Sequence, residues 1–128
     1  MDLKNKKEIE SLFKCCGIDR DINDYLEDLE RFRDEILSKE DFNETVNYFN
    51  ALGNDVRYLI YNLIGKKEMC VCELTATLNL SQSTISHHIH KLKQAGLIRG
   101  WKKGKFTHYE VVEDKLKLCV NLLINKLI

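Results

Sequence analysis

Residues 81–97 read SQSTISHHIHKLKQAGL, and this stretch decides the fold. Ser81 is a residue type that often caps the N-terminus of a helix, because its hydroxyl can accept a bond from a free backbone N–H. Gly96 is the type that follows a helix C-terminus, because glycine adopts a left-handed conformation without strain. The stretch therefore predicts one helix over residues 82–95, preceded by a tight turn at Asn79-Leu80.

The two faces of this helix have different chemistry. At 100° per residue, Ile85, Ile89 and Leu92 share one narrow face, which we expect to pack inward. The opposite face carries hydroxyls, histidines and an amide, with no acid. Short polar side chains allow close approach to the DNA major groove, and they offer donors and acceptors to base edges. The pattern predicts DNA contacts from Ser83, Thr84, Ser86, His87, His90 and Lys91.

Metal binding is an alternative role for the histidines of this helix. His87 and His88 point about 100° apart on a helix, so they do not share one ion. His87 and His90 lie closer together and could hold an ion weakly. We favour DNA contact or partial burial for these residues, and a structural role for His108.

A basic hairpin is predicted directly after this helix. Two runs rich in β-forming residues, Leu97–Lys102 and Lys105–Val112, flank Lys103-Gly104, which is a hairpin turn signal. A solvated charged turn would have the same composition. Beside the preceding helix, contact with DNA phosphates or the minor groove is favoured for the four cations Arg99, Lys102, Lys103 and Lys105.

The rest of the chain is helical in pattern. We expect helices over residues 3–15, from Asp21 or Asn23 to Leu37, from Asp41 to Leu52, from Asn54 or Asp55 to a stop at Gly65, within residues 69–79, and over Glu113–Leu127. The order predicts a mainly α fold with a small β-hairpin wing, a winged helix-turn-helix. Residues 1–40 would form a helical extension, and residues 41–128 a DNA-binding and dimerisation domain.

The charge of the chain is distributed unevenly. The formal net charge is zero, but residues 81–110 carry six Lys or Arg and one acid. Residues 1–40 carry eight Lys or Arg and twelve acids. Phosphate attraction acts locally, because salt screens charges beyond about 10 Å. Overall neutrality therefore does not argue against DNA binding.

Apolar stretches such as Leu122–Ile124 are far shorter than the roughly 20 residues that span a bilayer. The N-terminus MDLKNKKEIE is charged and does not resemble a signal peptide. We therefore expect a cytoplasmic protein without membrane contact, in which cysteines are reduced.

Four stretches together resemble the ArsR/SmtB family of metal-sensing repressors. They cover about half of the chain in the family's order: FNALGNDVRYLIYNLI (49–64), MCVCEL (69–74), LSQSTISHHIHKLKQAGLI (80–98) and RGWKKGKFTHYEV (99–111). The resemblance implies a homodimer whose first and last core helices form the interface. It implies a repressor that binds an imperfect palindrome in double-stranded DNA and leaves it when an inducer binds. It also implies base reading by Gln82, Ser83, Ser86 and His87.

Cysteine pairs suggest what the inducer is. Cys70 and Cys72 begin the first helix of the predicted helix-turn-helix, and thiolates prefer soft ions such as cadmium, lead, arsenite or zinc. Side chains at i and i+2 diverge in a helix and point the same way in an extended segment. Shared binding of one ion therefore requires an extended or distorted helix start, which would couple the ion to the recognition helix.

The resemblance also bears on the remaining ligands. The family's arsenic-sensing branch has a third cysteine at the position of Thr75, so a three-thiolate site within one helix is incomplete here. Its cadmium-sensing branch uses cysteines from an N-terminal extension. We therefore expect a site formed by Cys70, Cys72, Cys15 and Cys16, with no obligatory cofactor. Alternatively, Cys15 and Cys16 are only small residues at a helix end.

Other roles for the cysteines stay open at this level. The same DNA-binding regulator could respond to thiol–disulfide chemistry, or the acidic extension could be a docking or dimer-stabilising element without a metal. A thiol oxidoreductase is disfavoured, because such enzymes place their cysteine pair in a βαβ scaffold, and no enzyme activity is expected. Residues 113–128 lack histidine, so we expect no zinc site there. Cys119 is expected in the core or an interface.

Overall fold

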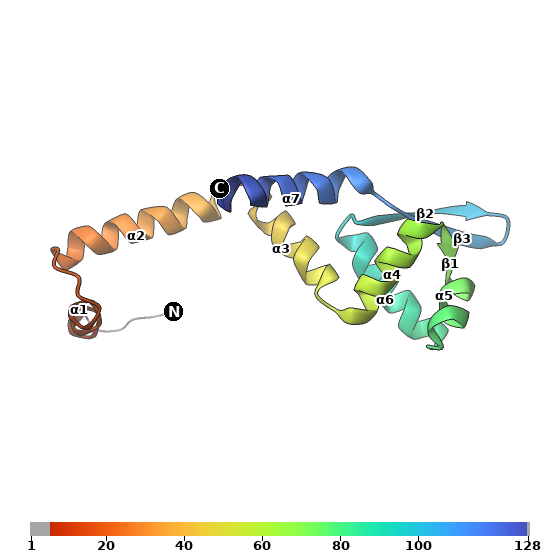
Figure 1. Ribbon diagram of the computed structural model, residues 1–128, viewed down its shortest axis with the longest axis horizontal. Coiled ribbons are helices and arrows are strands. Elements are labelled where there is room, and N and C mark those ends of the chain that lie inside the picture. Colours follow the sequence, from red (N-terminus) through yellow and green to blue (C-terminus); the bar gives the residue numbers. More distant parts are fainter. Residues whose placement is uncertain (1–5, 128) are drawn as a thin grey trace. The chain divides into compact units, whose positions relative to one another are not determined.

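The computed structural model describes residues 6–127 and divides the chain into two compact units, Met1–Phe42 and Asn43–Ile128. Figure 1 follows the elements along the chain. They are α1 (Lys6–Cys15), α2 (Ile22–Leu37), α3 (Asp41–Leu52), α4 (Asp55–Lys66), β1 (Met69–Cys70), α5 (Val71–Leu78), α6 (Gln82–Gln94), β2 (Ile98–Lys103), β3 (Phe106–Val111) and α7 (Glu113–Leu127). Every predicted helix is present, although residues 3–5 of the first lie outside the described residues. None of these helices is long and apolar enough to cross a membrane.

The N-terminal unit consists mainly of α1 and α2. Gly17 has a φ of +74° and ends α1, and the Asp21 carboxylate accepts bonds from two backbone N–H groups at the start of α2. The rings of Phe13 and Tyr25 meet edge to face at 5.5 Å, so the two helices pack at this end. Neither helix contains a fully buried residue.

Helices α5 and α6 form the predicted helix-turn-helix. Asn79 ends α5 in the left-handed conformation, with φ at 54°. Ser81 then caps α6, its Oγ accepting from the backbone N–H of Thr84 at 3.1 Å. Ile85, Ile89 and Leu92 of α6 are buried, as the periodicity predicts. The cap, the turn and the inward face of α6 are therefore all confirmed.

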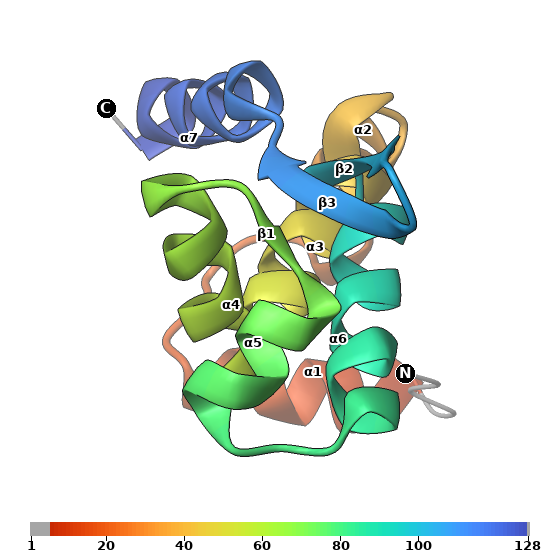
Figure 2. The ribbon, with the colours of Figure 1, turned by 90° about the vertical axis from the view of Figure 1, so that its right-hand side faces the viewer.

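A three-stranded antiparallel sheet follows, with strand order β1-β3-β2. Strands β2 and β3 form the predicted hairpin, which we call the wing. Strand β1 was not predicted, because two residues are too few to show an alternating pattern. It pairs Cys70 with His108 and Met69 with Tyr109 of β3. Figure 2 shows α5 and α6 below this sheet. The arrangement is a winged helix-turn-helix.

Two details of the sequence prediction are wrong. Helix α4 continues through Gly65 to Lys66, since a glycine inside a helix weakens it by about 1 kcal/mol but does not end it. The wing turn is Gly104-Lys105 rather than Lys103-Gly104. Gly104 has a φ of +67°, and this geometry pairs Lys103 with Phe106.

The core of the second unit joins α3–α7 and the sheet. Its fully buried members include Ile60 of α4, Leu74 of α5 and Leu97 beside the wing. Cys119 of α7 also belongs to this core, at 3% exposure. The core therefore holds the helix-turn-helix and the wing as one body.

We predict that Leu74→Ala lowers the free energy of unfolding by about 2–5 kcal/mol, because the side chain is fully buried and its loss leaves a cavity. Urea denaturation followed by circular dichroism measures this. The matched control is Leu12→Ala in α1, where the side chain is 52% exposed and the change should stay within about 0.5 kcal/mol. Equal losses at both positions would contradict this assignment of the core.

Candidate functional site

The outer face of α6 presents the residues that the sequence singled out. All seven are exposed, and α6 contains no acidic residue: Gln82, Ser83, Thr84, Ser86, His87, His90 and Lys91. The Thr84 hydroxyl also takes part in the cap, accepting from the Ser81 hydroxyl at 2.8 Å. An exposed helix face with donors and acceptors but without negative charge has the chemistry needed to enter a major groove.

His88 behaves differently from its neighbours on α6. It is half-buried and turns toward α4, where its Nδ1 lies 3.4 Å from a guanidinium nitrogen of Arg57. Burial lowers the pKa of His88, and the positive charges of Arg57, His87 and Lys91 lower it further. His88 is thus a packing residue between α4 and α6 rather than part of the exposed face.

The wing is basic, but its four predicted cations differ in their partners. Arg99 pairs with Glu110 across the β2–β3 ladder, and Lys103 Nζ lies 3.3 Å from a Glu68 carboxylate oxygen. Lys102 and Lys105 are exposed, and neither forms an ion pair among the residues that the structure describes. Surface pairs of this kind contribute only about 0–1 kcal/mol. All four cations can therefore turn to an external phosphate at little cost.

The CVC segment lies at a junction between a strand and a helix. Cys70 ends β1 with extended backbone, φ −93° and ψ 170°, and Cys72 lies in the first turn of α5. All five cysteines are free thiols; Cys15, Cys16 and Cys72 are exposed, whereas Cys70 and Cys119 are buried. Cys70 is thus extended but Cys72 is already helical, so the segment is only partly in the extended form in which both thiols could approach one soft ion.

Further ligands are not brought to this junction within the second unit. Among residues 6–127, no three Cys, His, Asp or Glu side chains are gathered as a metal site. Thr75, at the position of a third cysteine, has a buried hydroxyl without a hydrogen-bond partner in the described structure. Cys15 and Cys16 belong to the other compact unit. This junction thus supplies two thiols, Cys70 and Cys72, fewer than the three or four ligands that soft ions prefer.

Comparison with known proteins identifies the family to which this architecture belongs. The family model described as "Bacterial regulatory protein, arsR family" matches residues 54–99. An HTH-type transcriptional regulator of Methanocaldococcus jannaschii is 34% identical over 85 residues, covering 66% of this chain and 96% of the relative. The chain belongs to the ArsR family. Members of this family are transcriptional regulators rather than enzymes, as predicted.

Other relatives agree with the ArsR assignment. A putative arsenical resistance operon repressor ArsR of Halobacterium salinarum is 35% identical over 110 residues, covering 83% of this chain and 84% of the relative. The solved structure of HlyU from Vibrio cholerae has a TM-score of 0.58 and 28% identity, covering 66% of this chain and 92% of HlyU. These matches confirm the winged helix-turn-helix fold.

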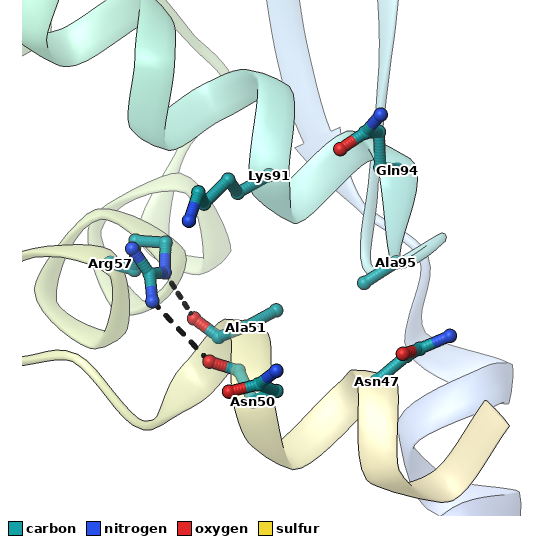
Figure 3. Close-up of a pocket in the computed structure, with 7 residues that line it drawn as sticks. All are labelled: Asn47, Asn50, Ala51, Arg57, Lys91, Gln94 and Ala95. Carbon is teal, nitrogen blue, oxygen red and sulfur yellow. Dashed lines mark hydrogen bonds between the residues drawn. The ribbon is translucent and has the colours of Figure 1, made fainter. Parts of the chain in front are cut away.

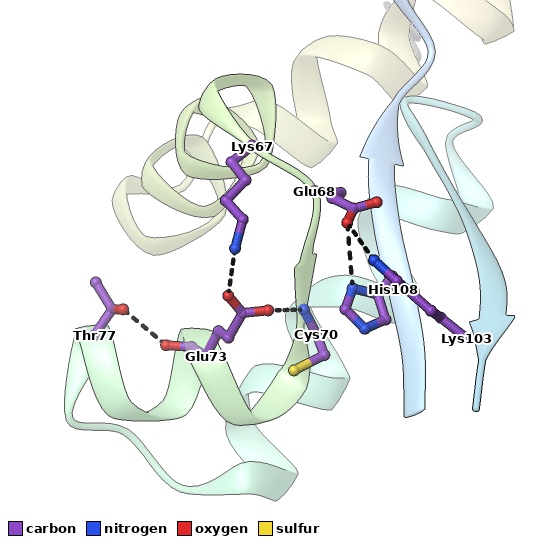
Figure 4. Close-up of polar contacts among 7 residues, drawn as sticks. All are labelled: Lys67, Glu68, Cys70, Glu73, Thr77, Lys103 and His108. Carbon is purple, nitrogen blue, oxygen red and sulfur yellow. Dashed lines mark hydrogen bonds and ion pairs between the residues drawn. The ribbon is translucent and has the colours of Figure 1, made fainter. Parts of the chain in front are cut away.

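In this ArsR-family chain, Glu73 is a site residue that the sequence prediction missed. Figure 4 shows its carboxylate between the Cys70 backbone and Lys67. One oxygen accepts from the Cys70 N–H at 3.1 Å, and the other lies 3.1 Å from Lys67 Nζ. The bond from the Cys70 N–H, with help from Lys67, lowers the pKa of Glu73 to about 2. The signal was present as an acid three residues after the N-cap.

The strand–helix junction that carries Cys70 and Cys72 is also connected to the wing. Glu68, just before β1, contacts Lys103 of β2 and lies 4.0 Å from Nδ1 of His108 in β3 (Figure 4). His108 is the register partner of Cys70, and its ring lies 6.2 Å from that of Trp101. Cys70 therefore shares one sheet with the basic hairpin, and His108, for which a structural role is predicted, lies within that sheet.

Proposed function

We propose that this ArsR-family chain is a sequence-specific DNA-binding repressor that a thiolate-bound soft metal or metalloid releases from its operator. The observation that carries this proposal is the position of Cys70. It ends the strand that pairs with the wing, and it is the N-cap of the helix that precedes α6. A change at this one residue therefore acts on both elements that would touch DNA.

The DNA-binding half of the proposal rests on chemistry and charge. Helix α6 enters the major groove with its acid-free face, and the wing lysines contact phosphates on its flank. Base edges would be read by Gln82, Ser83, Ser86 and His87. Phosphate or further groove contacts would come from Thr84, His90, Lys91, Arg99, Lys102, Lys103 and Lys105.

A homodimer on an imperfect palindrome is part of this proposal. Large apolar side chains on α3 and α7 are exposed, including Phe49, Leu118 and Ile124, and their burial against a second copy would stabilise a dimer. A solved Mycobacterium bovis protein of similar fold is described as a homodimeric winged helix-turn-helix domain. Two-fold symmetry would then place the half-sites about one helical turn apart, or a multiple of it.

The proposed sensing site uses thiols from both parts of the chain. Cys70 and Cys72 supply two ligands at the strand–helix junction, and Cys15 and Cys16 complete the set to three or four. Relatives include regulators named for arsenic and for cadmium resistance, both of them thiophilic elements. Thr75 leaves α5 without a third thiol, which is why the extension is needed.

Release follows from the bonds around Cys70. Bringing both sulfurs of the CVC segment onto one ion requires rotation of its backbone. That rotation strains the bond from the Cys70 N–H to Glu73 and the pairing of Cys70 with His108. The first supports the start of α5 and the second supports the wing, so the DNA-binding geometry is lost.

A redox switch is the second candidate, favoured by the exposure of Cys15, Cys16 and Cys72. Oxidation of cysteine pairs to disulfides would alter the same segments without a metal.

One experiment tests both candidates. Binding of the full chain to the DNA upstream of its own gene is measured by fluorescence anisotropy, with cadmium, lead, arsenite or zinc added under reducing conditions. We expect the chain to bind this DNA saturably. The DNA should be released when about one ion per subunit has been added, and a thiolate-to-metal charge-transfer band should appear in the absorption spectrum. Oxidant is added in a parallel series, and intact mass reports disulfides. Release by oxidant alone would replace the metal proposal with the redox switch, and absence of DNA binding would overturn both.

A further inference from the structure

A cleft of about 280 Å³ lies between α3, α4 and the side of α6. It is formed within the second unit alone. From α3 come Asn47, Asn50 and Ala51, from α4 comes Arg57, and from α6 come Lys91, Gln94 and Ala95. The cleft adjoins the exposed face of α6 that is predicted to bind DNA, because Lys91 belongs to that face and also lines the cleft.

The lining of this cleft is entirely without carboxylates. It contains two cations, three side-chain amides and two alanine methyl groups. Asp55, the acid nearest to Arg57 in the sequence, does not line the cleft, and its carboxylate accepts a bond from the Val56 N–H. Among the residues that the structure describes, neither Arg57 nor Lys91 forms an ion pair. Two positive charges thus face one cavity without a negative partner.

Arg57 lines the cleft, and two backbone carbonyls orient its guanidinium. Its Nε donates to the Ala51 carbonyl at 2.6 Å, and one terminal nitrogen donates to the Asn50 carbonyl at 3.3 Å. Figure 3 shows both bonds, with Lys91 reaching toward the same guanidinium from α6. These carbonyls are neutral acceptors, so they orient the guanidinium without neutralising it. A third N–H group, on the other terminal nitrogen, faces Nδ1 of His88 at 3.4 Å. The remaining two of the five guanidinium N–H groups stay available to a ligand.

We propose that this cleft binds a phosphate-type oxyanion between Arg57 and Lys91. A phosphate offers several acceptors to a guanidinium and an ammonium, and it would relieve the repulsion between them. The amides of Asn47, Asn50 and Gln94 can donate to the remaining oxygens without adding negative charge. The anion is either a phosphodiester of the DNA backbone or free phosphate. Only the first source rests on the proposed function.

The first test uses inorganic phosphate and the full chain without DNA. Binding is followed by NMR titration at constant ionic strength set with chloride. We expect saturable shifts around the cleft in the native chain. Lys91→Gln and Asn47→Asp should each weaken phosphate binding by roughly tenfold or more. The first removes a charged donor, and the second adds a negative charge that repels phosphate. Lys93→Gln and Asn62→Asp are matched changes outside the cleft and should alter binding less than about twofold.

The second test identifies the source of the anion. If the cleft seats a DNA phosphodiester, Asn47→Asp weakens binding to operator and to unrelated duplex equally. Lys91→Gln then makes the plot of the logarithm of the DNA-binding constant against the logarithm of salt concentration less steep, by about one unit of slope. If the cleft takes only free phosphate, Asn47→Asp loses phosphate binding but keeps its affinity for DNA.

Two outcomes would overturn the inference. In one, neither phosphate nor DNA affinity responds to Asn47→Asp. In the other, the control changes have equal effects, which indicates a general charge effect. Failure of the native chain to bind its upstream DNA, with phosphate binding intact, would instead refute the proposed function and leave the cleft as a free-anion site.

Discussion

Ser86→Glu on α6 should reduce affinity for the operator by about 100-fold or more, because it places a carboxylate on a face that contains no acid. Ser86 is exposed, and glutamate is a good helix former, so the fold should be retained. The loss combines repulsion by DNA phosphates with the removal of a short side chain that permits close approach to base edges. Anisotropy titration with a labelled operator measures the change.

Asn62→Glu on α4 is the matched control for this prediction. It makes the same change in charge at an exposed helical position away from α6 and the wing. We expect its affinity for DNA to stay within about threefold of the native value, since screening weakens distant charges. Thermal unfolding of both variants checks that they are folded. A similar loss in the two variants would mean that net charge, and not the α6 face, controls binding.

Much of this structure could be predicted from local signals. Asn79, Ser81 and Gly96 act through their own backbone conformations and bonds. They mark the end of α5 and the two limits of α6 without any knowledge of the fold. The inward face of α6 is likewise set by periodicity alone. These short-range signals are confirmed. Two others, the helix stop at Gly65 and the turn at Lys103-Gly104, are wrong, because helix α4 continues past its glycine and the strand pairing shifts the turn by one residue.

Contacts across the sheet could not be predicted in the same way. With the turn placed at Lys103-Gly104, Arg99 would stand opposite His108; the actual turn, one residue later, places it opposite Glu110. The contact between Glu68 and Lys103 joins residues 35 positions apart and depends on β1, which is too short to leave a pattern. The link from Cys70 to the wing therefore emerged only from the tertiary structure.

Cys72→Ser should abolish metal-induced release while leaving DNA binding intact. Cys72 is exposed in the first turn of α5, and serine is nearly isosteric, so the metal-free fold and its affinity for DNA should change by less than about twofold. A hydroxyl is a poor ligand for soft ions. Loss of one thiolate should weaken cadmium binding by more than about 100-fold, since even residues that only support ligands contribute about 10–100-fold.

Substitutions of the other cysteines are the controls for this prediction. Cys119→Ala removes a buried core thiol, so it should lower the melting temperature and leave the metal response unchanged. The double change Cys15→Ser with Cys16→Ser should weaken metal binding if the extension supplies ligands, and should have no effect if it is only structural. Release of Cys72→Ser from DNA at the same cadmium concentration as the native chain would exclude the CVC segment as the sensor. Because Cys72 lies between Cys70 and Glu73, the two residues of the helix cap, such a result would also remove the physical route from metal to wing.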